Sequence, residues 1–391
     1  MELSEFTVLR KGIDSLDVAF QGAIALEVRE HLREVKARAT SNGRAEYAVI
    51  NGVHGHVGET GASGGYAFRF DTGPDGEIWT IKDNPDPQEW NIRVSVANAQ
   101  LAVNGYHETK AALWARLEAF GARVVGESVS RADFAVDFVA PDFVLDAALL
   151  SCHWKSQPLE RGDFEGSIPV GGSEFLVASY RRQTSSVTVG MMPRRQVQIY
   201  NKSLEVSRKI GSHWYEVWGV DKDDCPPVWR VELRAGKDHL KEWKITTFED
   251  LETRMASMWA AACQGVRLMK YSPDDGENVT RVPDHALWEI LKDEVKCALV
   301  PFLEKADRKR VVEGRREDIQ KMYKSGVMGW CVSYAVAMGE TPSAAAEAFA
   351  DVLADEFRAF ARDDPKHFKR KMAAADERLF FLDEPGERAP F

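Results

Sequence analysis

Alternation of charged and apolar residues in two short segments constrains the fold of this chain most strongly. Ser130 to Phe138 and Val228 to Arg234 both follow this pattern. Because successive side chains of a β-strand point to opposite faces, each segment predicts a strand with one apolar and one charged face. A third segment, Val197 to Lys202, places a tyrosine and a lysine at the end of such a strand. The chain is therefore expected to build a sheet with ionisable groups on one face.

The remaining periodicity of residues 1–272 predicts strands mixed with helices. Ile13 to Phe20 alternates as a strand, and helical spacing follows over Ala23 to Ala39 and over His107 to Phe120. A further helix is predicted to begin near Thr247, because Thr247 and Asp250 form a Thr-x-x-Asp capping signal. Its apolar stripe consists of Leu251, Met255, Met258, Trp259 and Cys263. We therefore predict an α+β domain over residues 1–272, in which the strands pair antiparallel.

The end of the chain differs in character from the rest. Residues 283–391 have a helical pattern throughout, and they predict a separate C-terminal all-α domain. Its acidic, Ala-rich stretch from Glu340 to Asp364 favours a protein partner over DNA. The partners that we consider are a second copy of this protein, which would form a homodimer, and a host helicase.

Charge is distributed unevenly along the chain. The net charge is −10, which by itself argues against a polyanionic partner. Between Tyr180 and Lys244, however, 13 Lys and Arg residues stand against 8 Asp and Glu residues. This zone could attract a phosphate backbone, although an ordinary solvated face would have the same composition. No window of about 18 uncharged apolar residues exists, and the chain starts without a signal-peptide pattern, so no membrane association and a cytoplasmic location are expected.

Carboxylates on the predicted strands suggest a hard divalent cation. Asp133 and Asp137 are four residues apart, so on a strand they share one face, next to Arg131. Glu232 lies between Arg230 and Arg234 on a second strand. Mg²⁺ and Mn²⁺ prefer such oxygen ligands and leave positions for water and substrate phosphate. The alternative is a solvent-facing polar edge with a ladder of salt bridges of little energetic consequence.

Tyr200 is a candidate nucleophile. A phenol is a poor nucleophile until it is deprotonated, so attack on phosphorus requires a nearby cation or metal that stabilises the phenolate, and positive charge at the non-bridging oxygens. Lys202, Arg194 and Arg195 could supply that charge. A buried structural tyrosine is the alternative at the end of a strand.

A pair of histidines, His54 and His56, has the spacing of a metal pair borne on a strand. The turn signals Asn51-Gly52 and Gly55 favour instead a loop histidine pair without a metal.

Taken in order, four motifs resemble the replication initiation factor family, which contains rolling-circle plasmid initiators and relaxases of integrative elements of the type that lacks paired histidines. The similarity spans roughly residues 10 to 270, and its motifs are Gly12 to Leu16, Ser130 to Asp137, Gln196 to Glu205 and Trp229 to Arg234. The resemblance implies a saddle-like curved antiparallel sheet with helices on one face. It also implies a tyrosine that nicks one DNA strand at a hairpin or single-stranded origin, forms a 5′-phosphotyrosyl link and frees a 3′-hydroxyl.

The resemblance assigns roles to individual residues. Tyr200, Lys202 and Glu232 would be catalytic, and Asp133, Asp137 and Glu232 would hold Mg²⁺ or Mn²⁺. Glu205 would contact these groups and hold them in place without touching the substrate itself. The residues expected to contact DNA are Arg131, Arg194, Arg195, Arg230 and Arg234. Two alternatives stay open: a DNA-binding or regulatory protein that has lost the cut, and a metal-dependent nuclease that uses water.

Overall fold

A large open antiparallel sheet organises the protein. The structure is a computed structural model that describes residues 6–152, 168–169, 175–180, 183–208, 211–273, 278–298, 308–339 and 342–382. Twelve strands within these ranges form one sheet in the order β2-β3-β4-β5-β6-β1-β7-β13-β12-β11-β10-β9, and every neighbouring pair is antiparallel. The predicted α+β class is confirmed. A two-stranded sheet pairs β14 with β8.

The strands have these bounds: β1 Thr7–Ala23, β2 Glu46–Ile50, β3 Val53–Val57, β4 Phe68–Asp71, β5 Glu77–Ile81, β6 Trp90–Val96, β7 Arg123–Val139, β8 Leu150–Cys152, β9 Ile168–Pro169, β10 Phe175–Tyr180, β11 Gln183–Met191, β12 Arg195–Asn201, β13 Val228–Gly236 and β14 Val266–Leu268. The helices are α1 Leu26–Asn42, α2 Asn98–Ala119, α3 Lys202–Arg208, α4 His213–Trp218, α5 Lys237–Glu242, α6 Phe248–Gly265, α7 Ala286–Lys296, α8 Arg308–Ala337, α9 Pro342–Asp363 and α10 Pro365–Arg378, followed by the 3-10 turn η3 Phe380–Leu382.

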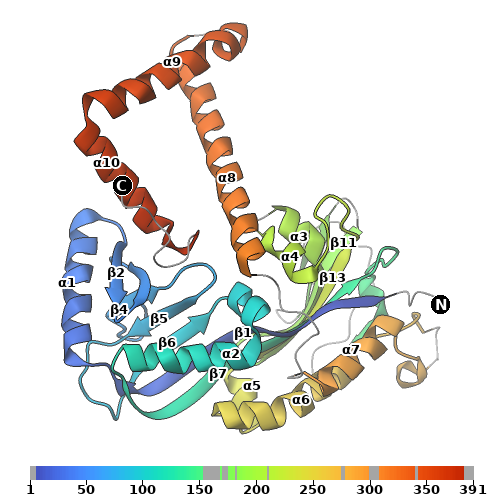
Figure 1. The fold of residues 1–391 in the computed structure, drawn as a ribbon. Helices are drawn as coiled ribbons and strands as arrows, with labels where there is room; N and C mark the ends of the chain where they lie inside the picture. The colour runs from blue at the N-terminus through green and yellow to red at the C-terminus, as the bar shows by residue number, and fades with distance from the viewer. Residues whose placement is uncertain are drawn as a thin grey trace.

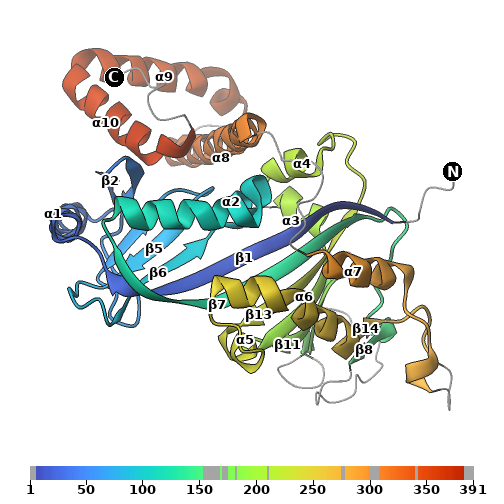
Figure 2. The ribbon, with the colours of Figure 1, turned by 60° about the horizontal axis from the view of Figure 1, so that its bottom comes forward.

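The long central strands β1 and β7 bend the sheet. Their pairing is interrupted by four register shifts, one of which lies between Ile13 and Ser15. Each extra residue at such a bulge bends the strand and increases its twist. The sheet is correspondingly curved in both ribbon views (Figure 1, Figure 2).

One face of the sheet is apolar and forms the main core. Phe134 of β7 stacks on Trp259 of α6, and Trp79 of β5 meets Phe120 at the end of α2. Helices α1, α2, α6 and α7 all contribute to this core. The capping box predicted at Thr247 and Asp250 is present, and all five predicted stripe residues of α6 are buried. Burial of such side chains contributes about 1.5–3 kcal/mol each.

Two predicted helices have different bounds in the structure. The first runs from Leu26 to Asn42, three residues later than predicted, and it ends at Gly43 in the left-handed conformation. The second begins at Asn98, nine residues before the predicted start, because Gly105 interrupts it with a positive φ of 75° and masks the earlier helical periodicity.

The C-terminal residues form helices, as predicted. Helix α7 packs on α6 and buries Leu287, Trp288 and Leu291 in the main core. Helices α8, α9 and α10 stand away from the sheet as three sides of an open frame, and α10 returns toward β2 (Figure 1). Whether residues 283–391 fold as a separate domain stays a prediction. No helix among the described residues is long and apolar enough to cross a membrane.

Candidate active site

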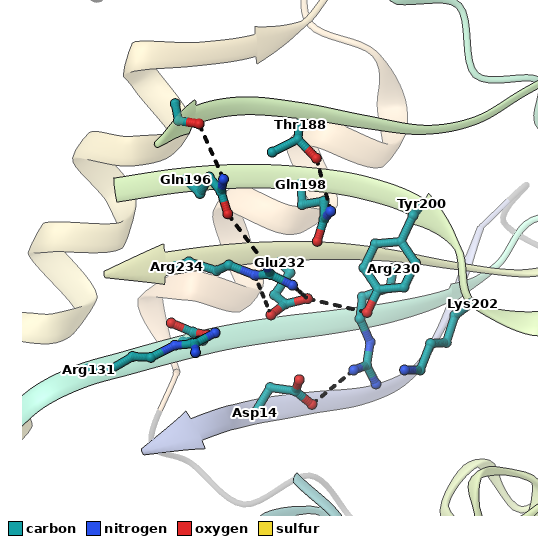
Figure 3. A network of polar contacts seen from close by, with 12 residues as sticks. Asp14, Arg131, Thr188, Gln196, Gln198, Tyr200, Lys202, Arg230, Glu232 and Arg234 are labelled. Carbon is teal, nitrogen blue, oxygen red and sulfur yellow. Dashed lines mark hydrogen bonds and ion pairs between the residues drawn. The ribbon is translucent and has the colours of Figure 1, made fainter. Parts of the chain in front are cut away.

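Polar side chains from three neighbouring strands form rows on the face opposite the apolar core. The register of β7, β13 and β12 places the residues of each row side by side. The rows are Asp137, Arg230 and Tyr200; then Ala135, Glu232 and Gln198; then Asp133, Arg234 and Gln196. Three motifs that are distant in the sequence therefore meet on one surface of the sheet (Figure 3).

Tyr200 contacts a carboxylate directly. Its hydroxyl donates to Glu232 Oε2 at 3.2 Å, and Arg234 holds the same carboxylate with two hydrogen bonds of 2.8 and 3.1 Å. Burial, assisted by Glu232, raises the pKa of the Tyr200 phenol well above its usual value. The phenol is therefore protonated in this arrangement, and Glu232 is positioned to accept its proton.

Lys202 approaches the tyrosine from the first turn of α3. Its ammonium lies 5.6 Å from the centre of the Tyr200 ring and 4.7 Å from that of Trp214, and it donates to Glu205 Oε2 at 2.7 Å. Burial lowers the pKa of Lys202, since the charged form loses its hydration, and Arg230 adds to this effect. Glu205 thus holds the Lys202 ammonium beside Tyr200.

Arg230 lies in a closed ionic cluster. It donates to both oxygens of Asp137, at 2.5 and 2.8 Å, and to Asp14 at 2.9 Å. The Arg230 side chain is 0% exposed, and the ring of Trp214 covers its guanidinium at 4.3 Å. Asp137 also accepts from the indole N–H of Trp218 at 2.8 Å. A direct contact of Arg230 with a DNA phosphate would require this cluster to open.

Asp133 has one oxygen bound and one without a partner. Its Oδ2 accepts from Arg131 at 2.8 and 2.5 Å, whereas its buried Oδ1 has no hydrogen-bond partner among the described residues. Burial raises the pKa of Asp133 to about 7, against the opposing effect of Arg131. A carboxyl group with a free, desolvated oxygen is an unusual feature of a folded protein and is typical of functional sites.

The distance between the two aspartates limits how a metal could bind. Four residues of strand separate Asp133 from Asp137 by about 13 Å, too far for both carboxylates to reach one ion. Both oxygens of Asp137 are also occupied by Arg230 and Trp218. Within the ranges described, no group of three or more His, Cys, Asp or Glu side chains is placed to hold a metal ion. Asp133 and Glu232 are the pair whose charges interact.

The two arginines at the start of β12 lie away from Tyr200. Arg194 pairs with Glu242 at 2.5 Å, and its side chain is 69% exposed. Arg195 pairs in register with Ala235, and alternation places it on the opposite face of the sheet from Tyr200. The structure thus gathers Lys202, Glu205, Glu232 and Arg234 at the tyrosine and leaves Arg194 and Arg195 outside.

Sequence reasoning assigned no role to Asp14, which accepts from both Arg230 and Arg10. The bulge between Ile13 and Ser15 turns this side chain into the cluster. The Gly12 to Leu16 motif was the available signal, but the partner of Asp14 is 216 positions away.

The histidine pair was predicted in a loop, and this prediction is wrong. His54 and His56 lie on strand β3, where β2 and β4 flank them. The turn signals belong to the tight connection before the strand, where Asn51 and Gly52 adopt positive φ.

Comparison with known proteins gives little further information. No family model and no curated protein matches the chain. One solved structure that matches is the rolling circle replication initiator protein from Geobacillus stearothermophilus, with 14% sequence identity and a TM-score of 0.40 over 76% of this chain and 99% of that chain. Similarity this weak assigns no function.

Proposed function

We propose that this protein nicks DNA and transfers the cut strand through a 5′-phosphotyrosyl intermediate at Tyr200. The observation that carries the proposal is the hydrogen bond from the Tyr200 hydroxyl to Glu232, at 3.2 Å, with Arg234 and Lys202 beside them. Nucleophile, proton acceptor and cations thus lie together on one face of the sheet, with Tyr200, Glu232 and Arg234 in successive rows of side chains. The ordered motifs that resemble replication initiation factors supply these same residues.

The reaction needs no co-substrate, because one phosphorus–oxygen bond replaces another. As the Tyr200 oxygen attacks phosphorus, its proton passes to Glu232, the new oxygen–phosphorus bond forms, and the bond from phosphorus to the 3′-oxygen breaks. The 3′-oxygen leaves and takes up one proton as a hydroxyl. Arg234 and Lys202 would stabilise the negative charge on the non-bridging oxygens. The phosphotyrosyl ester conserves the energy of the original bond, so attack by a 3′-hydroxyl can rejoin the strand.

A divalent cation is part of the proposal. Asp133 would hold Mg²⁺ or Mn²⁺ through its free Oδ1, and Glu232 would join it only if its carboxylate exchanged a hydrogen bond from Arg234 for the ion. The ion would add positive charge at the phosphate and so favour attack by the phenol. Magnesium commonly needs only one or two protein carboxylates, with water and phosphate completing its ligands.

The DNA would reach the site as a single strand or an opened hairpin. Of the predicted phosphate contacts on this face of the sheet, Arg131 and Arg234 remain partly exposed, at 33% and 26% of their side chains, whereas Arg230 is buried. Initiation of rolling-circle replication or mobilisation of a conjugative element would use this reaction. A homodimer or a helicase bound by residues 283–391 belongs to the same hypothesis.

Trapping of the covalent adduct tests the proposal. The protein is incubated with a hairpin oligonucleotide library and Mn²⁺, and protein–DNA adducts are resolved on a denaturing gel. Tyr200→Phe should abolish the adduct and leave DNA binding nearly unchanged, whereas Tyr215→Phe on α4 is the matched control and should keep it.

Three outcomes would contradict the assignment. An adduct that survives in Tyr200→Phe would make another tyrosine, such as Tyr180 or Tyr215, the nucleophile. Free 5′-phosphate ends without attached protein would identify a nuclease that uses water. Binding without any cut, and without dependence on Mn²⁺, would identify a DNA-binding or regulatory protein.

A further inference from the structure

A pocket of about 670 Å³ lies on the same face of the sheet as Tyr200, at the opposite wing. A chain of register partners connects the two regions across adjacent strands. Each partner in this chain shares the polar face with the next. The successive register partners are Tyr47, His56, Asp71, Ile78, Ser95, Asp17 and Arg131. Asp133 follows two residues after Arg131 on β7.

The C-terminal end of the described chain closes the pocket. The ring of Phe380 in η3 lies 5.7 Å from that of Tyr47 and 5.2 Å from that of His56. Arg316 of α8 donates to the carbonyl of Leu382 at 2.7 Å and so fixes η3 to the base of the helical frame. Strands β2 to β5 form the floor, and α10 with η3 forms the opposite wall. The pocket therefore exists only when the C-terminal helices are docked on the sheet.

The lining favours a flat ring with a polar edge. Tyr47, His56 and Phe380 supply aromatic surface. The charges of the floor neutralise one another, since Arg69 pairs with Asp71 at 2.9 Å and Arg44 with Glu46 at 3.4 Å. A highly charged ligand would find no net attraction on this floor. Aromatic walls with a few paired polar groups match the usual make-up of small-molecule sites, and the volume falls within their range of about 300–1,000 Å³.

His54 and His56 make contacts with neighbouring side chains on this wing. The Tyr47 hydroxyl is hydrogen-bonded to Nδ1 of His54. Burial lowers the pKa of His56, so its imidazole is neutral and can take part in stacking and hydrogen bonding. His56 thus contributes a neutral aromatic ring to the lining of the pocket.

We propose that this pocket binds an unstacked nucleobase of the DNA strand that Tyr200 attacks. This inference rests on the proposed function. A base presents a planar ring with donors and acceptors on its edge, and every base can stack on an aromatic side chain. The pocket would thereby set where the strand is cut, because the distance from the bound base to Tyr200 fixes the number of nucleotides between them.

The sheet sets the span between pocket and nucleophile. Six strand-to-strand steps separate β4 from β12. At about 4.8 Å per step they amount to about 29 Å across the strands. Tyr200 is in register with Asp137, six residues along β7 from Arg131, which adds about 20 Å along the strands and gives a span of about 35 Å. A strand with the 3.4 Å rise of B-form DNA covers this with about ten nucleotides, and an extended strand needs fewer. The captured base should therefore lie no more than about ten nucleotides from the attacked phosphodiester.

Fluorescent base scanning tests the inference. Single 2-aminopurine substitutions are placed along a cleavable oligonucleotide, and fluorescence is measured on binding to the full-length protein. One position within about ten nucleotides of the cut should change its fluorescence. Ile78→Trp, which fills the pocket from β5, should remove that change and weaken strand binding by about 5- to 150-fold, the contribution of one base stack.

The matched control is Val49→Trp. Val49 lies two residues after Tyr47 on β2, so its side chain is on the same face of the sheet. It does not line the pocket. This variant should keep both the fluorescence change and the affinity. If Ile78→Trp fails to fold, as judged by circular dichroism, Ser95→Leu fills the same space from β6.

The results separate this inference from the proposed function. Ile78→Trp should still form the Tyr200 adduct at saturating DNA. A position-specific signal that is lost in Ile78→Trp supports the pocket even if no adduct ever forms. The inference is overturned if no position responds, if the response persists in both pocket-filling variants, or if free 2-aminopurine deoxyriboside binds as tightly as the oligonucleotide.

Discussion

His213, the first residue of α4, should make this protein sensitive to mild acid. Its side chain is 5% exposed, and neither ring nitrogen has a hydrogen-bond partner among the described residues. Burial, reinforced by the positive charges of Arg315, Lys202 and Arg230, lowers the pKa of His213 to about 3. The folded protein therefore holds this imidazole neutral.

The sign and size of the effect follow from linkage. In the unfolded chain the pKa is about 6.5, so the unfolded state binds the extra proton as the pH falls below that value. Stability contributed by the neutral imidazole is complete above about pH 6.5 and is lost progressively down to about pH 3. Because pH 5 lies about 1.5 units below the pKa of the unfolded chain, the free energy of unfolding falls by about 2 kcal/mol at that pH.

Urea unfolding followed by tryptophan fluorescence measures this loss. The free energy of unfolding is compared at pH 7.5 and pH 5.0 for the parent protein and for His213→Leu. Carboxylates that titrate in the same interval contribute equally to both proteins, so the difference isolates His213. The parent should lose about 2 kcal/mol more than the variant. His367→Gln is the matched control for removal of a histidine, from α10. Parallel pH profiles of the parent and His213→Leu would refute the reasoning.

Two further predictions concern Asp133 and Leu291. The raised pKa of Asp133 means that the folded state binds its proton more tightly than the unfolded state, so stability falls as the pH rises from about 4 to about 7. Asp133→Asn should therefore raise the free energy of unfolding at pH 8 in EDTA by about 2 to 4 kcal/mol, and a decrease in urea titrations would contradict the assigned burial cost. Leu291→Ala on α7 should lower the stability of the whole sheet by about 2 to 5 kcal/mol in one unfolding transition, because Leu291 is buried in the main core; a separate transition for the C-terminal residues alone would show that α7 folds independently.

Local pattern predicted much of the sheet and of α6. Alternation identified β7, β12 and β13, since a strand buried on one face needs apolar side chains at every second position. The capping box at Thr247 was readable because both partners lie within one turn. Strand β1 extends six residues before and three residues after the predicted Ile13 to Phe20, because its bulges break the alternation on which the prediction depended.

The sequence by itself determined that carboxylates, cations and Tyr200 would share one face of a sheet, because side-chain direction is a local property of the strand. Only the tertiary structure decided which of these groups meet. Antiparallel register set Tyr200 beside Glu232, whereas Asp137 went to Arg230, with Asp14 entering from a bulge. Packing of the C-terminal turn η3 against β3 brought the ring of Phe380 to His56. Pairing between strands depends on the twist and bulges of the whole sheet, and no short window of sequence contains that information.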